Sequence, residues 1–240
     1  MQNKLDILAV GIHPDDVELG CSGTLMRELS LGKKCGILHL SKGEMGTRGT
    51  AELRIKESRA AAKLMGVTIL EQLDLSDCNF TNDADSRLKI IRVIRQYQPQ
   101  IVLCGALSDR HPDHGRSGKM VAESCFYSGL AKIITEWEGK NQMAFRPKAV
   151  YHYAQDRVVV PHFVVDISAY MQKKLEVIQC YSSQFYNAAS KETETPISGK
   201  DFLQLVEGKA KVYGREIGVE FGEAFVSERP LGVNTLSLLS

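Results

Sequence analysis

The stretch that decides the fold is Leu5-Asp6-Ile7-Leu8-Ala9-Val10-Gly11-Ile12-His13-Pro14-Asp15-Asp16-Val17-Glu18. Its first half, Leu5 to Gly11, is aliphatic and too short for a helix, so it predicts a buried β-strand. A polar turn follows at once and leads into a segment of helical period from Gly20 to Leu31. A buried strand that ends in a polar turn before a helix is typical of the first unit of a parallel α/β sheet.

The same alternation continues over the first two-thirds of the chain. Three more strands are expected, at Cys35 to Leu40, Thr68 to Leu73 and Gln100 to Cys104. Further helices are expected at Ala51 to Met65, which ends at Gly66, and at Ala84 to Gln98, which ends before Pro99. Because crossovers between parallel strands are right-handed, these helices should cover both faces of the sheet. The sequence therefore predicts an α/β fold with a Rossmann-like, doubly wound, mostly parallel sheet.

The rest of the chain is less regular. Strands are expected at Ala149 to Tyr153 and His162 to Ile167, and helices at Ala169 to Tyr181 and Phe202 to Ile217. The segment Ala188 to Lys200 is rich in Ser, Thr and Glu, and we interpret it as a mobile loop that could serve as a lid. No repeat or linker divides the chain, so residues 1–240 are expected to form a single domain.

The composition is that of an ordinary globular protein, with 43% hydrophobic and 25% charged residues in a chain of 240. The formal net charge is +1, which gives no reason to expect nucleic acid or a membrane surface as a partner. Six scattered cysteines without a C-x-x-C pair predict reduced thiols and exclude thiolate zinc clusters. No stretch approaches the ~20 apolar residues of a membrane-spanning helix. We therefore expect a cytoplasmic protein.

Histidines and carboxylates cluster in two turns. One turn, His13 to Glu18, follows the first predicted strand, and the other, Ser108 to Arg116, follows the fourth. Since open α/β sheets bind ligands beyond the carboxyl ends of their strands, the two turns should lie side by side. A histidine from each turn and one aspartate would suit Zn²⁺ or Fe²⁺ and leave a position open for water. The residues alone do not say which aspartate binds the metal and which acts as the base.

Each pattern has a plainer interpretation. Either His/Asp motif alone is more typical of a turn with a helix cap, and only their joint placement favours a metal site. Arg48, in the Gly-rich loop Gly43 to Thr50, is placed to hold a substrate carboxylate or hydroxyl through its planar fork, but a solvated loop arginine fits equally well. Structural roles are expected for His39, His152 and His162.

At these two motifs the chain resembles the LmbE-like or PIG-L family of zinc-dependent N-acetylglucosaminyl deacetylases. The family signature H-P-D-D-x-E-x-G matches His13 to Gly20, and its H-P-D-H signature matches His111 to His114. An Arg-containing helical segment with a downstream glutamate matches Glu52 to Glu57. The likeness is closest to the branch that acts in bacillithiol biosynthesis, with supporting stretches at His114 to Arg116, Glu123 to Phe126, Tyr181 to Phe185 and Tyr213 to Gly218.

The resemblance implies an LmbE-like fold and assigns roles to residues in both turns. His13, Asp16 and His114 would bind Zn²⁺, although Fe²⁺ or another divalent metal remains possible. Asp15 would be the general base, and His111 would steady the oxyanion or protonate the leaving amine.

Further roles follow from the same comparison. Asp113 would orient a metal-binding histidine. Arg48 and Arg54 would hold the substrate. The chain departs from the family at Ile12, where relatives often carry a smaller residue, and the larger side chain would narrow the pocket.

The implied reaction is removal of the acetyl group from N-acetylglucosaminyl-malate, giving glucosaminyl-malate and acetate. Its substrate would be a small amino-sugar glycoside, and relatives are often homo-oligomers, for which the apolar tail Leu236-Ser237-Leu238-Leu239 is a candidate interface. Three alternatives remain open: deacetylation of a mycothiol-type inositol glycoside or a chitooligosaccharide, a nucleotide-binding Rossmann-like module without hydrolase activity, and a non-haem iron oxygenase.

Overall fold

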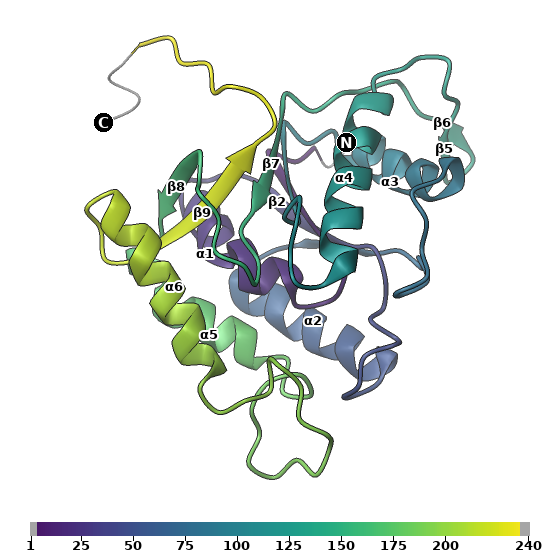
Figure 1. Cartoon of the computed structure of the whole chain (residues 1–240). Helices are drawn as coiled ribbons and strands as arrows, with labels where there is room; N and C mark the ends of the chain where they lie inside the picture. Colours follow the sequence, from purple (N-terminus) through teal and green to yellow (C-terminus); the bar gives the residue numbers. More distant parts are fainter. Residues whose placement is uncertain (1–3, 236–240) are drawn as a thin grey trace.

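The computed structural model describes residues 4–235, and its centre is a seven-stranded sheet in the order β3-β2-β1-β4-β7-β9-β8 (Figure 1). The strands of this sheet are β1 (Ile7–Gly11), β2 (Cys35–His39), β3 (Ile69–Gln72), β4 (Ile101–Cys104), β7 (Ala149–Tyr153), β8 (Phe163–Asp166) and β9 (Gly222–Ser227). The helices are α1 (Asp16–Ser30), α2 (Ala51–Met65), α3 (Ala84–Tyr97), α4 (Pro112–Tyr127), the short 3-10 helix η1 (Ser168–Tyr170), α5 (Met171–Gln179) and α6 (Phe202–Glu216). A two-stranded hairpin, β5 (Glu136–Trp137) and β6 (Lys140–Asn141), stands apart from the sheet.

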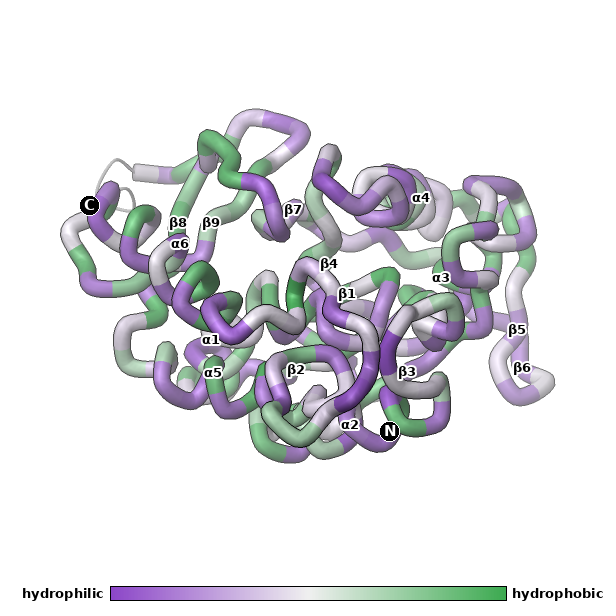
Figure 2. The backbone as a smooth tube through the Cα atoms, turned by 60° about the horizontal axis from the view of Figure 1, so that its bottom comes forward, coloured by the Kyte–Doolittle hydropathy of each residue, from purple (hydrophilic) through white to green (hydrophobic). Residues whose placement is uncertain are grey.

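Two hydrophobic cores lie on opposite faces of the sheet. Side chains of β1 alternate between them, because Ile7 and Ala9 pack in one core while Leu8 and Val10 pack in the other. The first core also takes its apolar residues from α1, α2, α5 and α6, and the second takes its own from α3 and α4. Figure 2 shows these two groups of helices on either side of β1 and β4. The prediction of a doubly wound α/β fold with helices on both faces is confirmed.

The structure corrects several predicted boundaries. Helix α1 begins at Asp16, not at Gly20, so the turn that contains His13 runs straight into the helix. Helix α4 was not expected, and neither was β9, which pairs antiparallel with both β7 and β8 and makes that end of the sheet mixed. The apolar tail proposed as an interface, 236–239, lies outside the described residues. Of the helices that are described, none combines the length and the apolar character needed to cross a bilayer.

Helix α1 is broken at Cys21, whose backbone angles are φ −149° and ψ 18°. The break frees backbone groups that a continuous helix would pair internally, and a buried ion pair satisfies them. Glu223 accepts hydrogen bonds from the backbone N–H groups of Gly23 (3.0 Å) and Thr24 (2.7 Å). Lys174 donates to the Leu19 carbonyl (2.8 Å) and to Glu223 (2.5 Å). This ion pair therefore fixes the bent helix whose first turn carries the candidate site.

We expect Lys174→Met to destabilise the protein by about 3–5 kcal/mol, because it leaves the Glu223 carboxylate buried without a counter-charge. Chemical denaturation of the purified variant measures this change in the free energy of unfolding. Lys173→Met is the matched control: Lys173 is exposed on the same helix, so its replacement should change stability by less than about 0.5 kcal/mol. Equal effects of the two substitutions would show that the buried ion pair has no special role.

Candidate metal and substrate site

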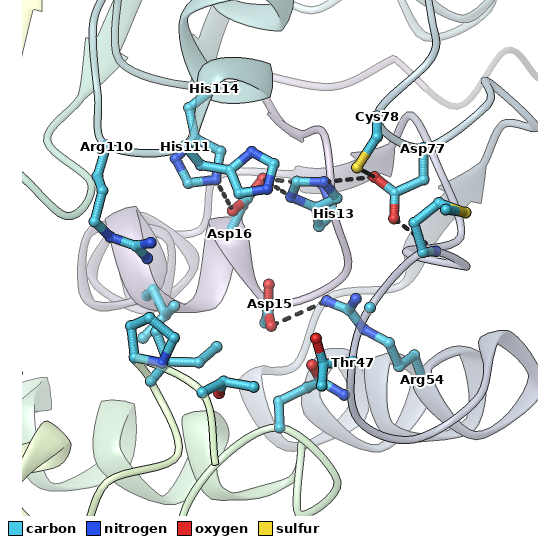
Figure 3. A pocket seen from close by; sticks show the side chains of 17 residues that line it. His13, Asp15, Asp16, Thr47, Arg54, Asp77, Cys78, Arg110, His111 and His114 are labelled. Atoms are coloured by element: carbon cyan, nitrogen blue, oxygen red, sulfur yellow. Dashed lines mark hydrogen bonds and ion pairs between the residues drawn. The ribbon is translucent and has the colours of Figure 1, made fainter. Parts of the chain in front are cut away.

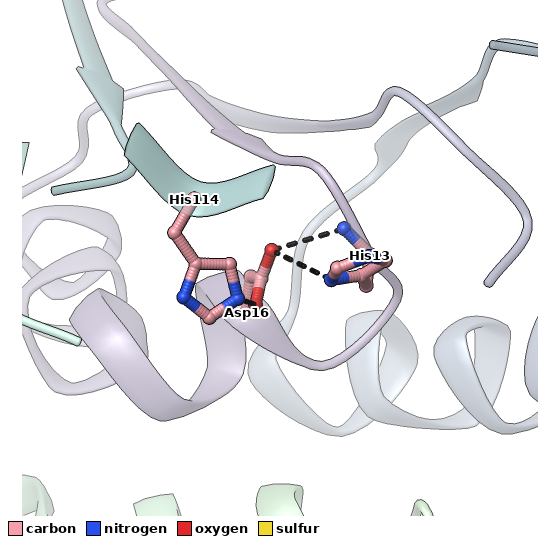
Figure 4. A group of neighbouring side chains, drawn as sticks. All are labelled: His13, Asp16 and His114. Atoms are coloured by element: carbon pink, nitrogen blue, oxygen red, sulfur yellow. Dashed lines mark hydrogen bonds and ion pairs between the residues drawn. The ribbon is translucent and has the colours of Figure 1, made fainter. Parts of the chain in front are cut away.

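The two histidine-containing turns lie side by side because β1 and β4 are adjacent parallel strands, with Val10 opposite Cys104. The chain leaves β1 toward α1 on one face and leaves β4 toward α4 on the other, so their carboxyl ends form the switch point where open α/β sheets bind ligands. His13 and Asp16 come from the turn after β1, and His114 lies in the first helical turn of α4 (Figure 4).

Three of the predicted residues converge at this point. One ligand atom each from His13, Asp16 and His114 lie within 4.8 Å of one another. Asp16 lies between the two rings: its Oδ1 is 3.2 Å from Nε2 of His114, and its Oδ2 is 3.8 Å from Nδ1 of His13. Two imidazole nitrogens and one carboxylate at this spacing fit a divalent cation such as Zn²⁺, with a further position left for water. The donor set therefore suits a catalytic metal ion.

Each candidate histidine has a buried carboxylate behind it. Nε2 of His13 is 2.9 Å from Oδ1 of Asp77, and Nδ1 of His114 is 2.5 Å from Oδ2 of Asp109. Metal-bound imidazoles are usually held by such a partner on the other ring nitrogen, which fixes the ring and the tautomer. The pairing leaves Nδ1 of His13 and Nε2 of His114 to face Asp16, which is the arrangement that a shared ion requires.

Asp113 was expected to orient a histidine, and the structure places it less directly than Asp77. Its Oδ2 is 3.7 Å from Nε2 of His13 and accepts the backbone N–H of Cys78 at 3.0 Å, while its Oδ1 pairs with Arg116. Asp113 and Asp77 therefore both lie near Nε2 of His13, and Asp77 is the closer of the two.

The carboxylates keep both histidines protonated in the metal-free protein. Burial lowers the pKa of His13, but the carboxylates of Asp113, Asp77 and Asp16 outweigh it, so the pKa is raised to about 9. Burial also lowers the pKa of His114, and Asp16 and Asp109 outweigh this effect, raising the pKa to about 10. A cation must therefore displace the protons from these rings.

Proton displacement makes metal binding depend on pH. Both pKa values are raised above neutrality, so at pH 7 the rings carry protons that a bound cation expels, and affinity should rise between pH 6 and 8 by roughly 10-fold or more per pH unit. Titrating weakly buffered, metal-free protein with Zn²⁺ while recording the base needed to hold the pH measures the release. Binding without proton release would contradict this assignment of the ligands.

Asp15 lies beside the three candidate ligands but has a different partner. Its backbone is left-handed, with φ 113° and ψ −23°, which turns its side chain away from the start of α1, where it makes no capping hydrogen bond. Nη2 of Arg54 donates to Oδ2 of Asp15 at 3.0 Å and to the Pro14 carbonyl at 2.5 Å. Burial raises the pKa of Asp15 to about 6, although the charge of Arg54 opposes the shift. Asp15 is therefore mostly ionised at neutral pH and can accept a proton.

His111 is the N-cap residue of α4. Its Nδ1 accepts the backbone N–H of Asp113 at 3.3 Å, so in the neutral ring the proton must sit on Nε2. The ring centroid of His111 is 4.9 Å from that of His13 and 5.2 Å from that of His114. His111 can therefore donate a hydrogen bond close to the candidate metal position.

These groups line a pocket of about 250 Å³ (Figure 3). Asp15 and Arg54 form one side of it, and the three histidines form the opposite side. Residues 195–197 close the pocket from the segment that was expected to be a lid. Arg48 does not belong to its lining: the side chain is buried, and its Nε lies 3.7 Å from Oε2 of Glu192 in the same segment.

Gln155 was missed in the sequence, although it follows β7 just as the known motifs follow β1 and β4. Its Oε1 accepts the backbone N–H of Ala106 at 3.0 Å, which forces its amide nitrogen to face Asp16. That nitrogen donates to Oδ1 of Asp16 at 3.1 Å, while Oδ2 of Asp16 accepts the backbone N–H of His13 at 2.9 Å. Two donors thus fix the plane of the candidate metal-binding carboxylate.

Gln155→Leu should weaken Zn²⁺ binding by about 10-fold or more, because residues that hold a ligand in place typically contribute 10- to 100-fold to metal affinity. A competition titration with a chromophoric chelator measures the dissociation constant. Gln204→Leu provides the control, since Gln204 is an exposed glutamine that lines a neighbouring cavity and not this pocket. An unchanged affinity in Gln155→Leu would rule out this role.

Comparison with known proteins agrees with the arrangement. The family described as PIG-L, GlcNAc-PI de-N-acetylase, matches residues 8–125, which contain both candidate metal-site turns. A solved structure of a conserved protein from Thermus thermophilus is 32% identical and superposes with a TM-score of 0.85, covering 95% of this chain and 97% of the other. The chain belongs to the PIG-L family.

Two curated relatives in the PIG-L family carry named activities. Diacetylchitobiose deacetylase from Thermococcus kodakarensis is 29% identical, over 75% of this chain and 70% of the relative. A probable N-acetyl-alpha-D-glucosaminyl L-malate deacetylase from Bacillus anthracis is 28% identical, over 81% of this chain and 86% of the relative. Both are deacetylases of acetylated glucosamine compounds, so the PIG-L match and these relatives point to the same class of reaction.

Proposed function

We propose that this protein is a zinc-dependent deacetylase that hydrolyses N-acetylglucosaminyl-malate to glucosaminyl-malate and acetate. The observation that carries the proposal is the convergence of His13, Asp16 and His114 within 4.8 Å, with Asp15 in the same pocket. The malate aglycone is supported by the relative from Bacillus anthracis and by the likeness to the bacillithiol branch of the family.

The chain supplies a base and a hydrogen-bond donor around the metal position. A Zn²⁺ ion held by His13, Asp16 and His114 would polarise the acetamide carbonyl and lower the pKa of a water molecule. Asp15 accepts the proton from the attacking water, and a pKa of about 6 suits a base that works near neutrality. Arg54 holds the Asp15 carboxylate in place through a 3.0 Å hydrogen bond.

His111 acts on the opposite side of the reacting carbonyl. The Nε2 proton of its ring is directed away from the helix, because Nδ1 is occupied by the Asp113 N–H. Its Nε2–H stabilises the oxyanion of the tetrahedral intermediate, and the proton that Asp15 took from the water passes to the departing amine. With Asp15 as base and then as acid, and with His111 as oxyanion donor, the reaction consumes one water, breaks the amide C–N bond and leaves acetate and the free amino sugar, and both side chains return to their starting protonation states.

A substrate panel tests the proposal. Acetate release is measured from N-acetylglucosaminyl-malate, the corresponding inositol glycoside, diacetylchitobiose and methyl N-acetylglucosaminide, with Zn²⁺ supplied. We expect the highest kcat/KM on the malate glycoside. A higher value on diacetylchitobiose would instead assign the activity named for the Thermococcus kodakarensis relative. No acetate from any member of the panel would refute the deacetylase assignment itself.

A further inference from the structure

A second cavity, of about 410 Å³, adjoins the pocket of the candidate metal site. The two share Leu19, Arg110 and Ile197 in their walls, so the cavity is a continuation of the reaction pocket toward α6. Its walls are mainly apolar, and the apolar side chains that line it are Leu19, Val158, Ile197, Phe202, Leu205, Val206 and Val212. The two spaces therefore meet at these three side chains.

Lys209 of α6 lines this cavity, and unlike the nearby cations it makes no ion pair with a carboxylate of the described residues. Its Nζ donates to the backbone carbonyl of Gln155, and no carboxylate of the described residues lies within ion-pair distance of it. Arg110, the other cation in the walls, is paired with Asp156 at 2.5 Å. Lys174 and Lys211 are also paired, with Glu223 and Glu207. Lys209 is thus an ammonium group without a counter-ion in a largely apolar cavity.

Electrostatics agree with the geometry. Burial lowers the pKa of Lys209 to about 8, and the nearby charge of Lys174 adds to the shift. The more distant carboxylates of Asp156, Asp109 and Glu223 oppose it but do not restore the ordinary value. An anion beside the ammonium would relieve this cost, because an opposite charge at close range favours the charged form.

One residue connects Lys209 with the candidate metal site. The side chain of Gln155 donates to Asp16, and the main-chain carbonyl of the same residue accepts from Lys209. In a glycoside of N-acetylglucosamine, the acetamide and the aglycone are attached to adjacent ring carbons. When the acetamide lies at the metal position, the aglycone must therefore lie within a few bond lengths of it. Asp16 and Lys209 are separated by a similar length, because both contact the single residue Gln155.

We propose that the α6 cavity binds the aglycone of the substrate and that Lys209 binds a carboxylate of that aglycone. The assignment rests on the proposed deacetylase function and adds a residue that determines specificity. The apolar walls contact the carbon skeleton of the aglycone, and the ammonium selects glycosides whose aglycone carries a carboxylate over neutral ones.

The experiment compares Lys209→Met with wild-type enzyme on N-acetylglucosaminyl-malate and on methyl N-acetylglucosaminide, which has no carboxylate. We expect the ratio of kcat/KM for the malate glycoside to that for the methyl glycoside to fall about 10-fold, mainly through KM for the malate glycoside, since one charge-assisted hydrogen bond is lost. Lys209→Arg should recover part of the ratio. Lys211→Met, which removes an exposed cation from the same helix, should leave the ratio unchanged.

A binding measurement gives a second readout. Calorimetric titration of metal-free protein with the product glucosaminyl-malate should show an affinity about 10-fold lower in Lys209→Met than in wild type, and the affinity for methyl glucosaminide should change much less. Similar losses for both ligands would overturn the specificity role. A change in subunit number for Lys209→Met, measured by light scattering, would show that the cavity is an interface between copies of the chain. Absence of acetate release by wild type from both glycosides would instead refute the deacetylase function.

Discussion

Asp15→Asn should retain bound Zn²⁺ while its kcat falls by about 10²- to 10⁴-fold, the range that a general base typically contributes. Asparagine is the appropriate replacement because Asp15 has φ 113°, a region that asparagine tolerates better than alanine does. The amide oxygen can still accept the hydrogen bond from Arg54, so the loss isolates the ability to take a proton. Steady-state acetate release and metal analysis of the same preparation measure the two quantities.

A matched control for this substitution is Asp85→Asn. Asp85 is an exposed residue in the first turn of α3, remote from the pocket lining, and its replacement should leave both kcat and metal content unchanged. If Asp15→Asn lost its metal together with its activity, Asp15 would be a ligand and the division of roles between Asp15 and Asp16 would be wrong.

His13→Ala should lose the metal itself. Removal of a residue that only orients a ligand already costs 10- to 100-fold in metal affinity, so the loss of a ligand should exceed about 100-fold. The cavity left behind also exposes Asp77 and Asp113 to each other, because both carboxylates face Nε2 of His13. Equilibrium dialysis against buffered Zn²⁺, followed by metal analysis, gives the affinity.

His162→Ala is the control for His13→Ala. His162 is exposed and hydrogen-bonded to the backbone of Ser227, far along the chain from either metal-site turn, so this variant should keep its metal. Equal zinc content in His13→Ala and wild type would remove His13 from the ligand set.

Much of the fold could be predicted from the sequence because the early elements follow strong local rules. The helix Ala51 to Met65 was predicted with the bounds that the structure shows, since Thr50 caps its start and Gly66, at φ 85°, ends it. The aliphatic strands β1, β2 and β4 were also expected, and their burial explains why they read as continuous apolar runs.

Other elements depend on contacts that no local pattern reveals. Helix α4, which begins at Pro112, contains Gly115 and Gly118, so its helix propensity is reduced, and tertiary packing stabilises it. Gly118 packs so closely on the residue after β4 that an added Cβ would lie 2.6 Å from the Gly105 carbonyl oxygen. Strand β9 is the last strand in the chain, yet it inserts between β7 and β8, a long-range pairing that the order of elements does not predict.

The site residues could be predicted where several histidines and aspartates cluster in one turn. They were missed where a loop contributes only one residue to the site. The rule that functional side chains follow the strands pointed to His13 and His114, which the structure brings together with Asp16. Applied to β3 and β7, the same rule would have led to Asp77 and Gln155, which lie a few residues after those strands. Asp109 lies within the second motif and contacts His114. Nothing in the sequence shows that Asp109, and not another carboxylate of the same loop, makes this contact.

The measurement that tests the central claim most directly is acetate release from N-acetylglucosaminyl-malate by one enzyme preparation in three states: as purified, after removal of metal by a chelator, and after addition of one equivalent of Zn²⁺. The geometry of His13, Asp16 and His114 predicts that activity disappears with the metal and returns when one ion per chain is restored. Undiminished acetate release from metal-free protein would contradict it.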